Sequence, residues 1–382
     1  MKLGIDPEVE QFRAEFAEFL DANLPNPVEA AQRPRSSSDV PEWARRWQRK
    51  LFDAGWLLPG NPPEFGGRNA TLAQQLAYRE ELSERRIYHS YNPQGVGIIA
   101  ASILTFGTEE QKREWAVPIL KADITASLGM SEPGAGSDLA GLRTRAVLDG
   151  DEFVVNGQKV WTSGAHHADV LLTFVRTDPE APKHKGISVL LIPTAAEGVV
   201  RRPFGSLTSP DDMDFNEVFF TDVRVPRKNL IGELNKGWSV AHGSLGHERN
   251  LLWLGYAEQM VWLLRDAPSD QEWYATLEMD LQALRLLGYR QLAGDRDPAE
   301  LSVLKVLGSE AVQAGNLNAL EENGADSLLH PTTTAPFNHM GLDVMSAGWF
   351  DRYSRGFGGT IAGGTSEIQR NIIAERILGL PR

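Results

Sequence analysis

The sequence contains no cysteine, which excludes disulfide bonds and thiol catalysis. It also contains no run of about 18 apolar residues, so we expect no membrane-spanning helix. Its beginning, MKLGIDPEVEQFRAEF, is charged and lacks the apolar stretch of a secretory signal. A formal net charge of -13 disfavours nucleic-acid binding, which depends on clustered Lys and Arg. These absences predict a cytoplasmic globular protein and leave its chemistry open.

The first third of the chain has the pattern of amphipathic helices. Val9, Phe12, Phe16 and Phe19 recur at three- and four-residue steps, which places them on one helix face. The polar, proline-containing stretch 25–41 predicts a surface connection. The helices expected in this part of the chain span Pro7–Leu24, Pro41–Ala54, Thr71–Arg85, Gly95–Phe106 and Glu109–Leu120.

The middle third changes to the pattern of β-strands. Two extended runs flank Asn156-Gly157, a dipeptide that predicts a hairpin turn. Because no helical pattern separates the strand-like runs, they favour an antiparallel sheet or small barrel. Helical periodicity returns after Pro226, so the fold class is α+β. Further strands are expected at Val170–Arg176, Gly186–Pro193, Gly198–Phe204 and Phe215–Val225.

Three segments carry glycine and hydroxyl residues that suit a ligand site. In SEPGAGSD, residues 131–138, backbone N–H groups could approach a polar ligand, although a plain loop explains the same residues. In GQKVWTS, residues 157–163, Trp161 is either a core aromatic or a surface for a planar ring. In IAGGTSEIQR, residues 361–370, Thr365 and Ser366 fit either simple helix capping or an anion or carbonyl site. No residue set predicts a metal site.

Four segments in this order resemble acyl-CoA dehydrogenases: SEPGAGSDLAG, NGQKVWTSGA, FNEVFFTDVRVPRKNLIGELNKGW and GGTSEIQRNIIAERILGLPR. The resemblance extends over nearly the whole chain. It implies an N-terminal α-helical domain over 1–124, a β-sheet or barrel domain over 125–229, and a C-terminal four-helix-bundle-like domain over 230–382. It also implies an FAD-dependent enzyme that converts an acyl-CoA thioester to the trans-2-enoyl-CoA.

The resemblance assigns roles to individual positions of this sequence. Arg249, Ser137 and Gly364 correspond to positions that contact the acyl-CoA, and Gly363 could offer its backbone N–H to the thioester oxygen. In the family, Trp161 would lie against the flavin ring and Ser163 near its N5 edge. The positions expected to contact the flavin are Leu128, Met130, Ser131, Gly136, Ser137, Trp161, Ser163, Thr365 and Glu367.

The catalytic base is expected at an unusual position. Many family members carry it directly before the C-terminal Gly-Thr, where this chain has Gly363. A minority branch places it in a Glu-Arg pair on a later helix, and Glu248-Arg249 matches that pair. Glu248 falls in helical register with Leu245 and Leu252, on an apolar stripe where a carboxylate pKa would rise. A rotated helix would instead leave Glu248 solvated beside Arg249.

The sequence also departs from the family where the ADP half of FAD is held. Neither the R-x-Q-F-G motif nor the Q-x-x-G-G-x-G motif is present, at 256–265 and 336–343 respectively. A related subunit in an α2β2 tetramer could supply that grip, as in actinobacterial relatives that degrade sterol side chains or other bulky acyl-CoAs. An electron-transfer flavoprotein is the expected acceptor. An oxygen-using acyl-CoA oxidase and a catalytically silent supporting subunit are the alternatives.

Overall fold

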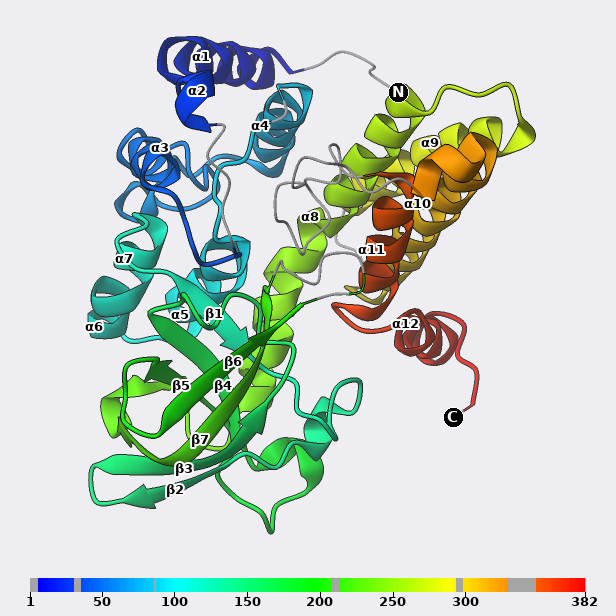
Figure 1. Ribbon diagram of the computed structural model, residues 1–382. Coiled ribbons are helices and arrows are strands. Elements are labelled where there is room, and N and C mark those ends of the chain that lie inside the picture. The colour runs from blue at the N-terminus through cyan, green and yellow to red at the C-terminus, as the bar shows by residue number, and fades with distance from the viewer. Residues whose placement is uncertain are drawn as a thin grey trace. The chain divides into compact units, whose positions relative to one another are not determined.

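The computed structural model describes residues 6–30, 36–85, 87–205, 207, 213–292, 298–328 and 348–381, the side chains of 242–252, 292, 298 and 328 excepted. The chain forms two compact units (Figure 1). The first comprises Met1–Gly134, Ala140–Pro203 and Asp214–Ala241. The second comprises Ala135–Leu139, Phe204–Met213 and His242–Arg382.

The first unit begins with the helices expected from the apolar periodicity. Asp6 caps α1 by accepting a hydrogen bond from Glu8 N, and Thr71 forms a capping box with Gln74 at the start of α4. Phe12 and Phe16 of α1 are buried, as their spacing predicted. The helices are α1 (Pro7–Asn23), α2 (Pro27–Ala30), α3 (Glu42–Asp53), α4 (Leu72–Glu84), α5 (Ala101–Phe106), α6 (Glu109–Gln111) and α7 (Val117–Leu120), with π-helical turns at Gly95–Ala100 and Lys112–Ala116.

The prediction of a surface connection over 25–41 is wrong for its second half. Ser36, Ser37 and Ser38 are buried. Asp214 Oδ1 accepts hydrogen bonds from Ser37 N at 2.9 Å and Ser37 Oγ at 3.0 Å, and Ser36 Oγ lies 2.8 Å from His167 Nδ1. These hydroxyls tolerate burial because residues distant in sequence satisfy them.

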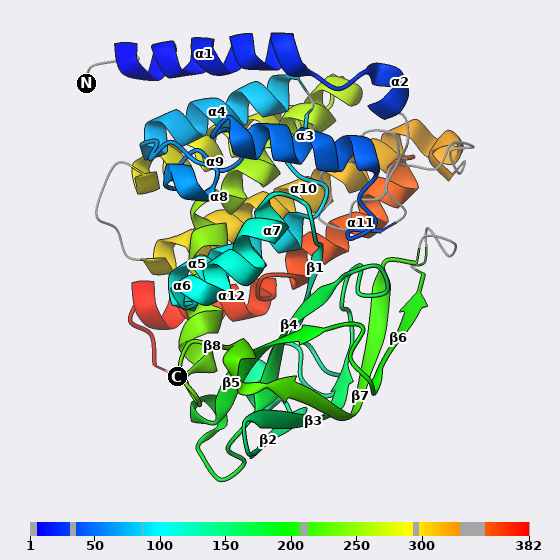
Figure 2. The same cartoon turned by 90° about the vertical axis from the view of Figure 1, so that its left-hand side faces the viewer.

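The sheet of the first unit has the order β6-β7-β3-β2-β4-β5-β8, and β1 pairs with β4. Most pairs are antiparallel, as predicted, but β1·β4 and β2·β4 are parallel. Figure 2 shows β2, β3 and β7 beside one another. The strands are β1 (Ala126–Gly129), β2 (Arg145–Asp149), β3 (Glu152–Lys159), β4 (Val170–Arg176), β5 (Ile187–Pro193), β6 (Val199–Phe204), β7 (Phe215–Pro226) and β8 (Leu230–Ile231).

The hairpin predicted at Asn156-Gly157 is wrong. The chain turns instead at Asp149–Glu152, where Gly150 has a φ of 62°. β3 runs on through Asn156 with a β-bulge between Val155 and Gly157. The strand continues because Asn156 pairs with the neighbouring β7: its Nδ2 donates to Asp222 Oδ1, and its Oδ1 accepts from Asp222 N, both at 2.9 Å.

The second unit is helical, as the periodicity after Pro226 predicted. Glycines on α10 allow close helix contacts: a Cβ at Gly308 would lie 2.7 Å from Tyr256 Cβ, and one at Gly315 would lie 2.5 Å from Leu263 Cδ2. In the described parts of the chain, no helix is long and apolar enough to cross a membrane. The helices are α8 (Gly237–Asp266), which begins in the first unit, α9 (Glu272–Leu292), α10 (Leu301–Asn323), α11 (Trp349–Ile361) and α12 (Ser366–Ile372).

Candidate functional site

Two segments of the first unit that the sequence analysis singled out lie side by side. Leu128 lies on β1, and its N–H donates to Gln94 Oε1 at 3.3 Å. Met130 and Ser131 follow directly, and all three positions are half-buried. Ser131 O accepts a hydrogen bond from Val160 N at 3.0 Å. The structure therefore brings Met130 and Ser131 next to the end of β3 and the turn that contains Trp161.

Trp161 occupies a strained turn and is not a core aromatic. Its φ is 61°, a left-handed value that is uncommon for a bulky residue, and its side chain is 58% exposed. The indole contacts the ring of Phe215 in a T-shaped arrangement, with ring centroids 5.4 Å apart and an interplanar angle of 86°. The N–H groups on either side, of Val160 and Thr162, donate to Ser131 O and Asn216 O and hold the turn.

The two residues after Trp161 are buried polar groups. Thr162 is fully buried, and its Oγ1 has no hydrogen-bond partner in the part of the chain that the structure describes. Ser163 is 2% exposed, and its carbonyl accepts from Ser127 Oγ. This turn thus combines an exposed indole with hydroxyl groups immediately behind it.

A buried ion pair beneath these segments was missed by the sequence analysis. Lys159 Nζ lies 2.8 Å from Glu132 Oε1, and the two side chains are 0% and 8% exposed. Burial lowers the pKa of Lys159 to about 8, against the opposing charge of Glu132. Burial alone would raise the pKa of Glu132, but Lys159 and backbone N–H donors hold that pKa below its ordinary value. The available signal was a charge of opposite sign in each of the two motifs, Glu132 in the first and Lys159 in the second.

The remaining predicted contact residues belong to the second unit. Gly136 and Ser137 are exposed. Thr365 caps α12, since its Oγ1 accepts from Ile368 N at 3.2 Å, so capping accounts for this hydroxyl. The side chain of Glu367 is 79% exposed and lies 4.0 Å from Arg370.

Gly363 and Gly364 directly precede the cap of α12. Their φ values are 68° and 96°, which favour glycine at both positions. Gln369 Nε2 donates to Gly363 O at 3.2 Å and fixes the turn. Among the described residues, a Cβ added at Gly363 would meet no heavy atom within 4 Å, and glycine provides no side-chain base.

Two predictions fall outside the described residues. Glu248 and Arg249 lie within the backbone of α8, but their side chains are not among those described. Segment 336–343, where one ADP-binding motif was expected, also lies outside the described residues.

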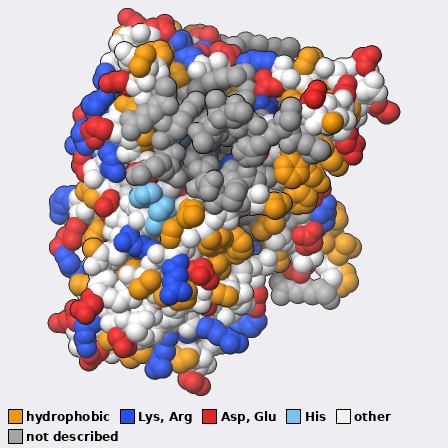
Figure 3. All heavy atoms as spheres, in the orientation of Figure 1, with side chains coloured by type: hydrophobic (Ala, Val, Ile, Leu, Met, Phe, Trp, Pro, Cys, Tyr) orange, Lys and Arg blue, Asp and Glu red, His pale blue; other side chains and the backbone are white. Residues whose placement is uncertain are grey.

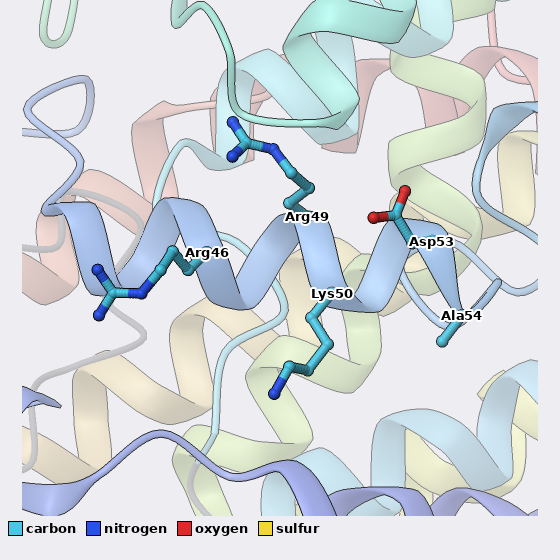
Figure 4. A pocket seen from close by; sticks show the side chains of 5 residues that line it. All are labelled: Arg46, Arg49, Lys50, Asp53 and Ala54. Carbon is cyan, nitrogen blue, oxygen red and sulfur yellow. The ribbon is translucent and has the colours of Figure 1, made fainter.

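A shallow depression on α3 is lined by none of the predicted site residues. Arg46, Arg49, Lys50, Asp53 and Ala54 line it. Figure 4 shows the three basic side chains fanning out in different directions. Arg46 and Arg49 pair with Glu29 and Asp123 at 3.3 and 2.6 Å. Exposed ion pairs therefore account for these charges, and the depression has no convergent polar groups.

The residues of the first unit fit a flavin. A planar heteroaromatic ring needs an accessible flat apolar surface with polar groups at its edge. The exposed indole of Trp161 offers such a surface, and the half-buried Ser131, joined to the same turn by the bond from Val160 N, offers a polar group beside it. A Cβ at Gly134 would meet nothing within 4 Å in the part of the chain that the structure describes, so this loop leaves room for a close approach there.

Three domain families match the chain in sequence order. Residues 6–123 match the acyl-CoA dehydrogenase N-terminal domain, 127–223 its middle domain and 235–378 its C-terminal domain. The acyl-CoA dehydrogenase FadE26 of Mycobacterium tuberculosis is 33% identical over 410 residues, covering 100% of this chain and 99% of that protein. The acyl-CoA dehydrogenase IpdE1 of the same organism is 35% identical and covers 98% of each chain.

Solved structures agree with these sequence matches. The steroid ACAD Tcur3481-Tcur3483 has a TM-score of 0.80 and 32% identity, with full coverage of both chains. The ChsE4-ChsE5 complex from Mycobacterium tuberculosis has a TM-score of 0.78 and 31% identity, also with full coverage. The expected architecture of helical, β and helical domains is confirmed. The chain therefore belongs to the acyl-CoA dehydrogenase family, whose members are FAD-dependent oxidoreductases acting on acyl-CoA.

Proposed function

We propose that this chain desaturates the α,β-bond of an acyl-CoA that carries a steroid or similarly bulky acyl group. The observation that carries this proposal is the glycine at position 363. Many family members have the catalytic carboxylate there, whereas Gly363 combines a positive φ with a position where an added Cβ would meet no atom of the described residues within 4 Å. The base must then lie elsewhere, and the vacated volume suits a wide acyl group. Similarity to the steroid ACAD Tcur3481-Tcur3483 supports the same substrate class.

Glu248 is the proposed base. It belongs to the long helix α8 and matches the Glu-Arg pair of the minority branch, with Arg249 as a contact for the acyl-CoA. An α-proton beside a thioester is weakly acidic, so its removal needs a carboxylate whose pKa has risen towards the working pH. The backbone N–H of Gly363 is proposed to donate to the thioester oxygen, where negative charge develops.

The turn around Trp161 is the proposed flavin-contacting surface of the first unit. When bound, FAD supplies the hydride acceptor that no side chain can provide. Trp161 would cover the flavin ring, and Leu128, Met130, Ser131 and Ser163 would line its edge. The exposed indole supports this role, because an apolar side chain of that size is 58% exposed only at an energetic cost. Gly136, Ser137, Gly364, Thr365 and Glu367 remain the proposed contacts of the second unit.

An electron-transfer flavoprotein is the proposed electron acceptor, and a related acyl-CoA dehydrogenase chain is the proposed partner in an α2β2 tetramer. The partner is supported by the absent R-x-Q-F-G motif at 256–265 and by the two-chain neighbours Tcur3481-Tcur3483 and ChsE4-ChsE5. The acceptor follows from family resemblance. Rapid oxidation of the reduced enzyme by air would instead favour an acyl-CoA oxidase.

Replacing Glu248 with Gln tests the proposed base. We expect turnover of a steroid-carboxylic CoA thioester to fall about 10²- to 10⁴-fold, because the neutral amide cannot take the α-proton. The bound flavin should remain, since the substitution keeps the side-chain size. Mass spectrometry of the thioester, which loses two hydrogens on desaturation, measures turnover, and visible absorption measures flavin.

Glu278→Gln is the matched control, because Glu278 is an exposed residue of α9. Its turnover should equal that of the wild type. Unchanged turnover in Glu248→Gln would remove Glu248 from the mechanism. Equal rates with butyryl-CoA and the steroid thioester would contradict the proposed substrate class while leaving the base unaffected.

A further inference from the structure

The Lys159–Glu132 pair is almost completely buried, and stability alone does not explain why two charges lie there. Lys159 Nζ has two acceptors, Glu132 Oε1 at 2.8 Å and Met130 O at 3.1 Å. Removing two charges from water is costly, and well-packed apolar residues often stabilise a fold as much as a buried pair does. The pair is therefore better explained by the positions that it fixes than by the stability that it adds.

Apart from the ion pair itself, the printed hydrogen bonds of the two side chains go to backbone groups, those of Met130, Arg143 and Thr144. Glu132 Oε1 accepts from Thr144 N at 2.8 Å, and Oε2 accepts from Arg143 N at 2.6 Å. Together with the bond from Lys159 to Met130 O, these contacts tie residues 130–132 to the end of β3 and to the start of β2. An apolar pair of equal volume would fill the same space without fixing this register.

Trp161 lies two residues beyond Lys159 and depends on the same register. Its left-handed backbone is unfavourable for a tryptophan and persists only where the flanking backbone is held. The residue before it, Val160, is held by the hydrogen bond from its N–H to Ser131 O. Ser131 lies between Met130, whose carbonyl accepts from Lys159, and Glu132. Loss of the anchor would therefore allow both Ser131 and Trp161 to move.

We propose that Lys159 and Glu132 are positioning residues that hold the 130–132 segment and the Trp161 turn in the arrangement that receives the flavin. This inference rests on the proposed flavin-facing role of Trp161. The pair does not touch the reacting atoms; it acts through the backbone of Met130 and Ser131 and through the turn after Val160.

Lys159→Met tests the inference, with Lys228→Met as the matched control. Lys228 forms an exposed pair with Glu114 at 3.1 Å in the same unit. Amide hydrogen exchange of the flavin-free protein should accelerate at least about tenfold in 130–134 and 160–164 in Lys159→Met, because a charged hydrogen bond to the backbone is lost. Flavin affinity, titrated by flavin fluorescence in the chain with any co-purifying partner, should weaken about tenfold or more. Lys228→Met should change neither quantity.

The double variant Lys159→Met/Glu132→Gln separates positioning from stability. It leaves no unpaired buried charge, so its thermal midpoint should recover most of what Lys159→Met loses. Exchange in 130–134 and 160–164 should nevertheless remain fast, because the bond to Met130 O is still absent. Wild-type exchange in this double variant would overturn the inference.

Trp161→Ala distinguishes failure of this inference from failure of the proposed flavin site. Weakened flavin binding in Trp161→Ala with wild-type exchange and binding in Lys159→Met would refute only the positioning role. Unchanged flavin binding in Trp161→Ala would refute the proposed site. The exchange measured in Lys159→Met would then still decide whether the pair orders these segments.

Discussion

The ionisation of Glu132 is tied to the folded state, because its pKa is lowered at the candidate site. Its folded pKa lies below the ordinary value of 4.5, because Lys159 and two backbone N–H groups favour the carboxylate more than burial disfavours it. A carboxylate with a lowered folded pKa contributes stability above its unfolded pKa, and this contribution is lost as the pH falls through the folded pKa.

Acid should therefore remove the stability advantage of the wild type over Glu132→Gln. We expect the difference in urea midpoint between the two proteins to be large at pH 7 and to shrink below about pH 4.5, because protonated Glu132 no longer pairs with Lys159. Urea unfolding at pH 7, 5 and 4 measures this difference. A difference that stays constant across this range would contradict the lowered folded-state pKa of Glu132.

Single residues reveal how far sequence reasoning can reach. The motifs around Ser131 and Trp161 were recognised in the sequence, and the structure places them next to each other through the bond from Val160 N to Ser131 O, while their role as ligand contacts stays a prediction. The Lys159–Glu132 pair was not recognised, because 27 residues separate its members and only the tertiary fold brings them together. Buried Ser36–Ser38 escaped prediction for the same reason, since their partners Asp214 and His167 lie far along the chain.

At the scale of elements, glycines set the distance between the helices of the second unit. A Cβ at Gly308 of α10 would lie 2.7 Å from Tyr256 Cβ of α8, closer than packed atoms tolerate. Tyr256 OH also donates to Gly359 O of α11 at 3.3 Å. The position of Tyr256 therefore affects the packing of α8 against both α10 and α11. Gly356 of α11 differs, since a Cβ there would meet its nearest atom, Gln313 Cα, at 3.5 Å.

Gly308→Ala should destabilise the protein by about 1–3 kcal/mol, because the added methyl group forces α8 and α10 apart. Gly356→Ala is the matched control: its methyl group fits, and alanine favours a helix over glycine by about 1 kcal/mol. Thermal unfolding should thus give a lower midpoint for Gly308→Ala and an equal or higher one for Gly356→Ala. Equal shifts in both variants would show that helix propensity, and not contact distance, governs these positions.

Elements also differ in how well local sequence predicts them. The helices of the first third follow from apolar spacing and capping residues, which act within one or two turns. The Asn156-Gly157 turn failed because pairing with Asp222 on β7 overrides the local preference of this dipeptide. β1 and β2 were not predicted, since short strands of 4 and 5 residues in a mixed sheet are defined by their partners.

At the scale of the whole molecule, the second unit leaves apolar side chains uncovered. Phe350, Phe357 and Ile361 of α11 are 40%, 45% and 61% exposed, and Leu378 is 64% exposed. Figure 3 shows hydrophobic side chains gathered where α11 reaches the surface. Exposed apolar groups that lie together on one helix are typical of surfaces that bind another chain or a ligand. This agrees with the proposed α2β2 assembly.

The chain purified alone should contain far less than one flavin per protomer, because it lacks both sequence motifs that grip the ADP half of FAD. Co-expression with an acyl-CoA dehydrogenase chain that carries R-x-Q-F-G and Q-x-x-G-G should give a co-purifying tetramer with bound flavin. Flavin absorbance per protein and light-scattering mass measure the two quantities. A homotetramer of this chain with one flavin per protomer would refute the shared site.

A co-purified tetramer whose flavin bleaches with a steroid thioester, but not when this chain carries Glu248→Gln, would place the base in this chain and the ADP-binding motifs in the partner. If bleaching survives Glu248→Gln, this chain only supports an active relative.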